Sequence, residues 1–220
     1  MADKSVIAQY VELYLRNKMG VSVSALQKLS ASDIDIAITE LKAGSAAPQY
    51  RIGGYYGPEG VVGTLLLTNQ VATVGPMVFD SYMVAEEIGV DTTTAGTEGN
   101  LYVVVYTDNE GAPGNLVYTT PALSVLGTTF KSATGLNVPF VPGLYWVGCL
   151  INGVVTTAAT VRSVANNSRY IGETAGGNDI AMSAYITAAT LASTPPAIFP
   201  AISAVAAAAP RILFKCKSTQ

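Results

Sequence analysis

The chain has 220 residues, 50% of them hydrophobic, which is enough for one large domain with a real core plus a short appendage. Only 12% of the residues are charged, about half the usual share, and the formal net charge is −3. Nucleic-acid binding is therefore not expected, because no basic stripe is available to neutralise phosphates.

The N-terminal sequence lacks the apolar core of a signal peptide, and no run approaches the roughly 20 apolar residues that span a bilayer. We therefore expect synthesis in a cytoplasm, no export by the ordinary route and no membrane insertion. A surface poor in charge but rich in small polar residues favours a protein that sits against neighbours in an assembly. The alternative is a thermally hardy extracellular domain.

Three short helices are expected at the start of the chain, over residues 3–19, 24–29 and 32–44, because their apolar residues recur at helical spacing. Three such helices bury too little surface to stand alone. We interpret them as an anchor or oligomerisation segment, with simple packing on the following domain as the alternative. The candidate interface consists of the apolar residues Ile7, Val11, Tyr14, Leu15, Leu26, Leu29, Ile34, Ile38 and Leu41.

A linker of small residues, Gly44 to Pro48, marks the domain boundary, because the periodicity changes there from helical to strand-like. Residues 1–48 are thus expected to form the helical segment and linker, and residues 49–220 a β-sandwich domain. Short strand-like runs separated by Gly and Pro predict an antiparallel, jelly-roll-like sandwich. These runs are residues 50–56, 63–68, 77–90, 101–107, 116–119, 128–132, 144–151, 180–187 and 211–217.

The stretch 101–120 is the clearest β signal, with two β-rich runs on either side of a seven-residue turn. It predicts a β-hairpin or a tight strand connection. In the last strand, alternation places Ile212, Phe214 and Cys216 on the inward face. We therefore predict that Cys216 is a buried thiol, in preference to a disulfide with Cys149.

The chain contains no histidine, which removes Ser–His and Cys–His nucleophile pairs and the usual zinc ligands. The adjacent acids Glu86 and Glu87 are expected on opposite faces of one strand, which does not suit glycosidase chemistry. Asp108, Asn109 and Glu110 could offer oxygens to Ca²⁺, but such residues are ordinary turn formers. We expect no enzyme, no catalytic residue, no metal and no cofactor.

Aromatic side chains are the candidates for stacking on a sugar. The possible glycan contacts are Tyr55, Tyr56, Trp146 and Tyr170. Tyr145 and Trp146 are adjacent in one strand, so that strand can expose only one of the two, and the other is expected in the core.

Several short motifs occur in a fixed order over residues 50–220. They are Tyr55-Tyr56, Leu65-Leu-Leu-Thr-Asn69, Ile88-Gly-Val-Asp-Thr-Thr93, Tyr106-Thr-Asp-Asn-Glu-Gly-Ala-Pro-Gly114, Val141-Pro-Gly-Leu-Tyr-Trp146, Phe199-Pro200 and Pro210-Arg211. In this order they resemble a set of bacteriophage virion proteins described as tail-fibre, head-fibre or decoration-like. The alanine-rich stretch 197–209 departs from the commonest pattern, and the first 49 residues lie outside the resemblance.

The resemblance implies a structural virion protein that forms a homotrimer with a jelly-roll-like sandwich and is fastened to the capsid, collar or tail by its N-terminal segment. Its location would be the virion, and its partners other copies of itself and other virion proteins. The alternative is a carbohydrate-binding module that recognises a glycan on the host surface.

Overall fold

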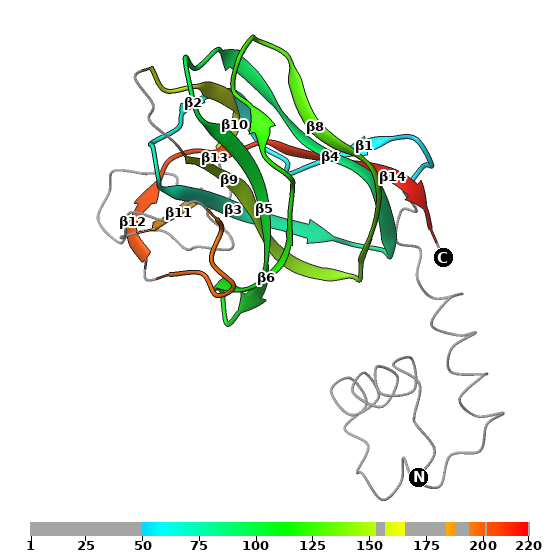
Figure 1. Ribbon diagram of the computed structural model, residues 1–220. Helices are drawn as coiled ribbons and strands as arrows, with labels where there is room; N and C mark the ends of the chain where they lie inside the picture. Colours follow the sequence, from blue (N-terminus) through cyan, green and yellow to red (C-terminus); the bar gives the residue numbers. More distant parts are fainter. Residues whose placement is uncertain (1–49, 153–156, 166–183, 188–193, 201, 220) are drawn as a thin grey trace, which may run out of the picture. The chain divides into compact units, whose positions relative to one another are not determined.

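The computed structural model describes residues 50–152, 157–165, 184–187, 194–200 and 202–219 (Figure 1). The chain divides into the units Met1–Ala47 and Pro48–Gln220, and the described residues all belong to the second. The three expected helices, and with them every residue of the candidate anchor interface, lie outside the described residues. The described residues themselves contain strands, turns and loops but no helix.

Two seven-stranded sheets make up the described domain, and all their strand pairs are antiparallel. The first sheet has the order β1-β14-β4-β10-β13, with β2 on β10 and β8 on β4. Its strands are β1 Tyr55–Tyr56, β2 Val61–Leu66, β4 Met83–Thr94, β8 Phe130–Phe140, β10 Thr160–Ala165, β13 Ala209–Pro210 and β14 Ile212–Ser218.

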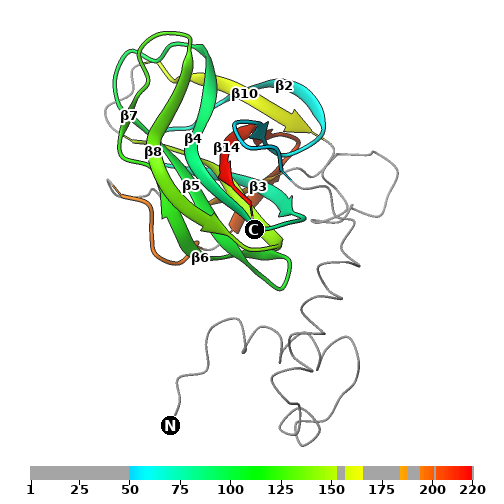
Figure 2. The same ribbon diagram turned by 90° about the vertical axis from the view of Figure 1, so that its right-hand side faces the viewer.

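The second sheet has the order β12-β11-β3-β9-β5-β6, with β7 on β5 (Figures 1 and 2). Its strands are β3 Ala72–Phe79, β5 Asn100–Asn109, β6 Ala112–Thr119, β7 Leu123–Ser124, β9 Gly143–Asn152, β11 Ala184–Thr187 and β12 Ile202–Ala206. The expected class, a mainly β protein with antiparallel sheets in a sandwich-like arrangement, is confirmed.

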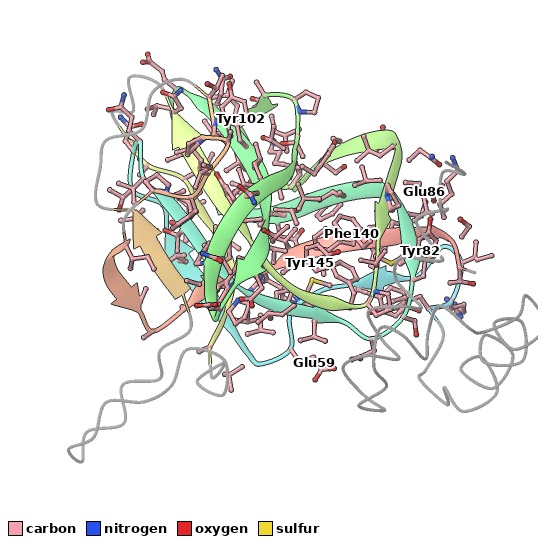
Figure 3. All side chains as sticks on the ribbon, turned by 90° about the horizontal axis from the view of Figure 1, so that it is seen from below. Glu59, Tyr82, Glu86, Tyr102, Phe140 and Tyr145 are labelled. Atoms are coloured by element: carbon pink, nitrogen blue, oxygen red, sulfur yellow. The ribbon has the colours of Figure 1, made fainter. Side chains whose placement is uncertain are left out.

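The main core lies between the two sheets. It contains an aromatic cluster, in which Phe79 stacks on Phe140 at 4.6 Å between ring centroids and meets Tyr145 and Phe214 edge-on at 5.4 and 5.3 Å. Figure 3 shows Phe140 and Tyr145 among the ribbons and Glu86 at the periphery. Burial of these rings contributes hydrophobic free energy to the stability of the domain.

A second, smaller core covers the opposite face of the second sheet. It consists of Ala72, Val74, Val104, Tyr106, Trp146, Leu150 and Phe199. The central strands of this sheet are therefore buried on both faces, which explains why β9 is buried without interruption from Tyr145 to Asn152. Tyr145 and Trp146, of which the strand was expected to expose one at most, are both buried for this reason, with exposed fractions of 9% and 0%.

Several strand boundaries differ from the prediction. The single run 77–90 is two strands, because β3 ends at Phe79 and β4 begins at Met83. The predicted hairpin is present as β5 and β6, but its turn has two residues and not seven. Glu110 and Gly111 both have positive φ, +54° and +86°, as a type I′ turn requires. The strands β7, β10, β12 and β13 were not predicted.

Both cysteine thiols are free and buried. Ile212, Phe214 and Cys216 share the inward face of β14, and Cys216 is 0% exposed, so its predicted orientation is confirmed. Burial raises the pKa of both the Cys149 and the Cys216 thiols, which keeps them protonated and poorly nucleophilic.

Candidate functional site

A β-bulge at Glu86 distinguishes the outer face of the first sheet. In the ladder with β14, Ala85 pairs with Cys216 and Glu87 pairs with Lys215, so Glu86 is an extra residue in β4. The bulge shifts the inward–outward alternation by one residue. Ala85 and Ile88 both enter the core, while Glu86 and Glu87 both lie toward the outer surface. The expectation that the two acids occupy opposite faces is therefore wrong.

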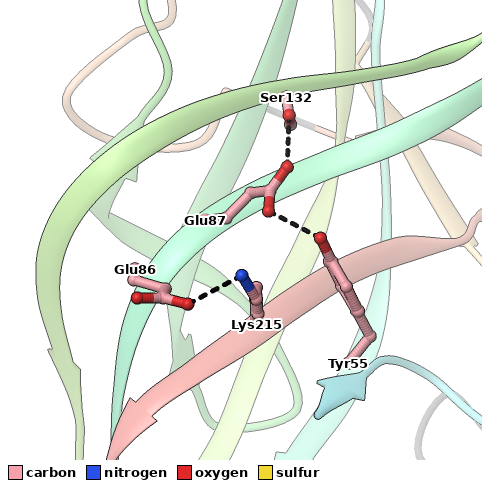
Figure 4. Close-up of polar contacts among 5 residues, drawn as sticks. All are labelled: Tyr55, Glu86, Glu87, Ser132 and Lys215. Atoms are coloured by element: carbon pink, nitrogen blue, oxygen red, sulfur yellow. Dashed lines mark hydrogen bonds and ion pairs between the residues drawn. The ribbon is translucent and has the colours of Figure 1, made fainter. Parts of the chain in front are cut away.

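The two carboxylates have different partners (Figure 4). The Tyr55 hydroxyl donates to Oε2 of Glu87 at 2.6 Å, and the Ser132 hydroxyl donates to Oε1 at 2.6 Å. Glu86 Oε1 instead lies 2.9 Å from Nζ of Lys215. The contacts with Glu87 and Glu86 raise the pKa values of Tyr55 and Lys215 respectively, so the phenol remains protonated and the amine remains charged at neutral pH.

An aromatic ring completes this group of side chains. Phe130 on β8 meets Tyr55 edge-on, with ring centroids 5.7 Å apart and planes at 89°. The Phe130 ring lies over Gly89, where a Cβ atom would stand only 2.8 Å from Phe130 Cζ. The same Cβ atom would come even closer to the Lys131 carbonyl oxygen and to Ser132 Cβ, so Gly89 admits the close approach of β8 as a whole, the ring included. We call Tyr55, Glu86, Glu87, Phe130, Ser132 and Lys215 the outer-face patch.

Among the predicted glycan contacts that the structure describes, Tyr55 is the well-exposed one, at 46%. Tyr56 packs against the main core, and its hydroxyl oxygen accepts the backbone N–H of Arg51 at 2.6 Å. Trp146 is fully buried, so the prediction that it contacts a glycan is wrong. Tyr170 lies outside the described residues.

Sequence reasoning did not identify Phe130, Ser132 and Lys215 as neighbours of Tyr55. Two signals for the patch are present in the sequence of β4. Its inward residues are Met83 and Ala85, then Ile88 and Val90, so one step of three interrupts the period of two. Gly89 within a strand is the second signal, since such a glycine often marks the close approach of another group.

The residues of the hairpin motif form hydrogen bonds with the turn and with the second core. Trp146 Nε1 donates to Asp108 Oδ1 at 2.8 Å, and the backbone N–H of Gly111 donates to Asp108 Oδ2 at 3.3 Å. The Asp108 carboxylate thus connects the turn to the second core. Among the described residues, no three His, Cys, Asp or Glu side chains gather closely enough to hold a metal ion.

The Phe199-Pro200 motif packs on the same unit. The Tyr106 hydroxyl donates to the carbonyl of Pro196 at 3.1 Å, and the Tyr106 and Phe199 rings meet edge-on at 5.1 Å. The backbone N–H of Phe199 donates to the carbonyl of Gly114 at 2.9 Å. Motifs separated by more than 80 residues in the chain therefore meet in one packed cluster.

Neither a protein-family model nor a curated protein matches this chain. In the part of the chain that the structure describes, no helix is long and apolar enough to cross a membrane. The function is therefore inferred from the residues and their arrangement.

Proposed function

We propose that this chain is a non-enzymatic structural component of a bacteriophage virion, a tail or head fibre or a capsid decoration protein. Residues 1–48 attach it to the capsid, collar or tail, and residues 49–220 display a jelly-roll-like sandwich. The assembled form is a homotrimer. In this role the chain is not expected to bind nucleic acid or to insert into a membrane.

The observation that carries the proposal is the convergence of the motifs on one cluster. Tyr106, Asp108, Gly114, Trp146 and Phe199 come from three separate motifs, yet they contact one another through side-chain and backbone hydrogen bonds and ring packing. Residues that specify the packing of a sandwich are the ones that proteins of similar construction would share. The proposed likeness to virion proteins rests on the shared order of such packing residues.

The surface supports placement in an assembly. Strand β2 carries no charged residue, and Val61, Val62 and Leu66 are exposed by 64%, 51% and 64%. An uncharged apolar edge strand is unfavourable on an isolated protein, because it can pair with other chains. Contact with neighbouring subunits would cover such a surface.

The test compares the full chain with a variant that lacks residues 1–44, each supplied to cells that assemble the particle. The particles are banded by density and probed with antibody against the chain. The full chain should band with the major capsid protein, while the truncated chain should stay in the soluble fraction. Absence of the full chain from banded particles would refute the virion role. Incorporation of the truncated chain at normal copy number would refute only the anchor.

The oligomeric state has its own test, because an amphipathic helix of about 16 residues is marginal alone and needs a partner surface. Light scattering of the purified full chain should give the mass of a trimer. Val11→Asp with Leu15→Asp should weaken the trimer, and Val11→Leu with Leu15→Met is the matched control. A monomer mass at micromolar concentration would contradict self-association.

A further inference from the structure

We propose that the outer-face patch binds a neutral pyranose unit of an oligosaccharide, with Tyr55 as the stacking platform. Tyr55 is 46% exposed, but its hydroxyl is held by Glu87 at 2.6 Å and its ring by Phe130 at 5.7 Å. A ring that is already fixed loses little conformational entropy when a ligand covers it.

The polar groups beside the ring retain hydrogen-bonding capacity. A carboxylate has about four lone-pair sites, and Glu87 accepts one bond at each oxygen, from Tyr55 and from Ser132. An ammonium group has three donors, and Lys215 directs one of them to Glu86. Neighbouring hydroxyls of a pyranose ring need such acceptors and donors at the edge of an apolar face, which is the usual composition of a small-molecule site.

The net charge of the patch favours neutral sugars over acidic ones. Glu86 and Glu87 contribute −2 and Lys215 contributes +1, so the patch carries a formal charge of −1. Sulfated, phosphorylated and uronic sugars would be repelled by this charge. Neutral hexoses and N-acetylhexosamines offer hydroxyl donors to Glu87 without that cost.

The bulge at Glu86 is the reason that both carboxylates lie on the outer face of the sheet. Without the extra residue, regular alternation would direct one of the two carboxylates inward. Bulges of this kind often occur beside functional sites, where they redirect a side chain. Four strands, β1, β4, β8 and β14, then hold the patch as part of the sheet and not on a loop.

The test applies the fluorescently labelled full chain to an array of neutral hexose and N-acetylhexosamine oligosaccharides together with sulfated and uronic glycans. The full chain should bind one or more neutral glycans and no acidic one. Tyr55→Ala should weaken that binding by about tenfold or more, and Tyr55→Phe, which keeps the ring but removes the bond to Glu87, by less. Tyr102→Ala, a change to a half-buried tyrosine on the second sheet, should leave it unchanged.

The urea midpoints of Tyr55→Ala and Tyr55→Phe are measured alongside. Because the Tyr55 side chain is 46% exposed, both midpoints are expected to stay close to that of the parent. Binding to no neutral glycan would overturn the proposal, as would equal binding by Tyr55→Ala and the parent. The inference goes beyond the virion role and does not depend on it. Array binding is measured on the purified chain, whereas incorporation is measured on particles, so the two proposals fail separately.

Discussion

Replacing Phe79 by Ala should remove the centre of the aromatic cluster. Phe79 is 0% exposed and contacts the rings of Phe140, Tyr145, Phe214 and Tyr50, the last at 6.3 Å. Truncation of a buried Phe to Ala costs about 3–5 kcal/mol through lost transfer free energy and the cavity left behind. Aromatic pairs add roughly 0.5–1.5 kcal/mol beyond area, not additively, so we expect a loss near the upper limit, about 4–5 kcal/mol.

Urea unfolding followed by the fluorescence of Trp146, the single tryptophan, measures this loss, with far-UV circular dichroism as the second probe. The midpoint should fall while the m-value stays constant. Phe79→Leu should cost clearly less, because it refills most of the volume. Val141→Ala, at a position 50% exposed, should change stability by less than about 0.5 kcal/mol. A loss below about 2 kcal/mol for Phe79→Ala would refute the assignment of this ring to the centre of the aromatic cluster.

Three further predictions concern single side chains. Cys216→Ser should destabilise the domain by about 1–3 kcal/mol, because a hydroxyl replaces a buried thiol, and reductant should not change the melting temperature of the parent. Burial raises the pKa of Tyr106 above its usual 10.0. The protonated phenol is thus favoured by folding, and its contribution is complete below about pH 10 and lost as the pH rises further. Tyr106→Phe should therefore make the alkaline decline of the urea midpoint shallower, whereas an identical slope would contradict the burial. Glu110→Asn should raise stability by about 1 kcal/mol in the same assay, since Asn tolerates the positive φ of +54° better than Glu, and a decrease would contradict the turn type.

The alternation of the last strand determined by itself which residues of β14 face the core. Ile212, Phe214 and Cys216 were assigned inward from a period of two, and this is how they lie. The hairpin of β5 and β6 was likewise readable, because β-branched and aromatic runs on either side of turn residues are local signals. The antiparallel class was predicted from the many short strand-like runs that Gly and Pro residues separate.

The length of the hairpin turn could not be predicted from the residues of the turn region alone. Pro113 and Gly114 are typical turn residues, yet both lie within β6. Gly114 is needed in that strand, because a Cβ atom there would come within 2.9 Å of Thr107 Oγ1. Cross-strand packing therefore placed the turn at Glu110 and Gly111.

Only the tertiary structure decided which faces are covered and which side chains meet at the surface. A continuous apolar strand such as β9 can be covered on one face or on both, and the packing of Phe199 on the second core settled the burial of Trp146. The outer-face patch joins Tyr55, Glu87 and Lys215, which are separated by 32 and 128 positions along the chain. Their meeting depends on the pairing of β4 with β14 and on one bulge, and pairing register is a property of two strands that neither sequence segment specifies alone.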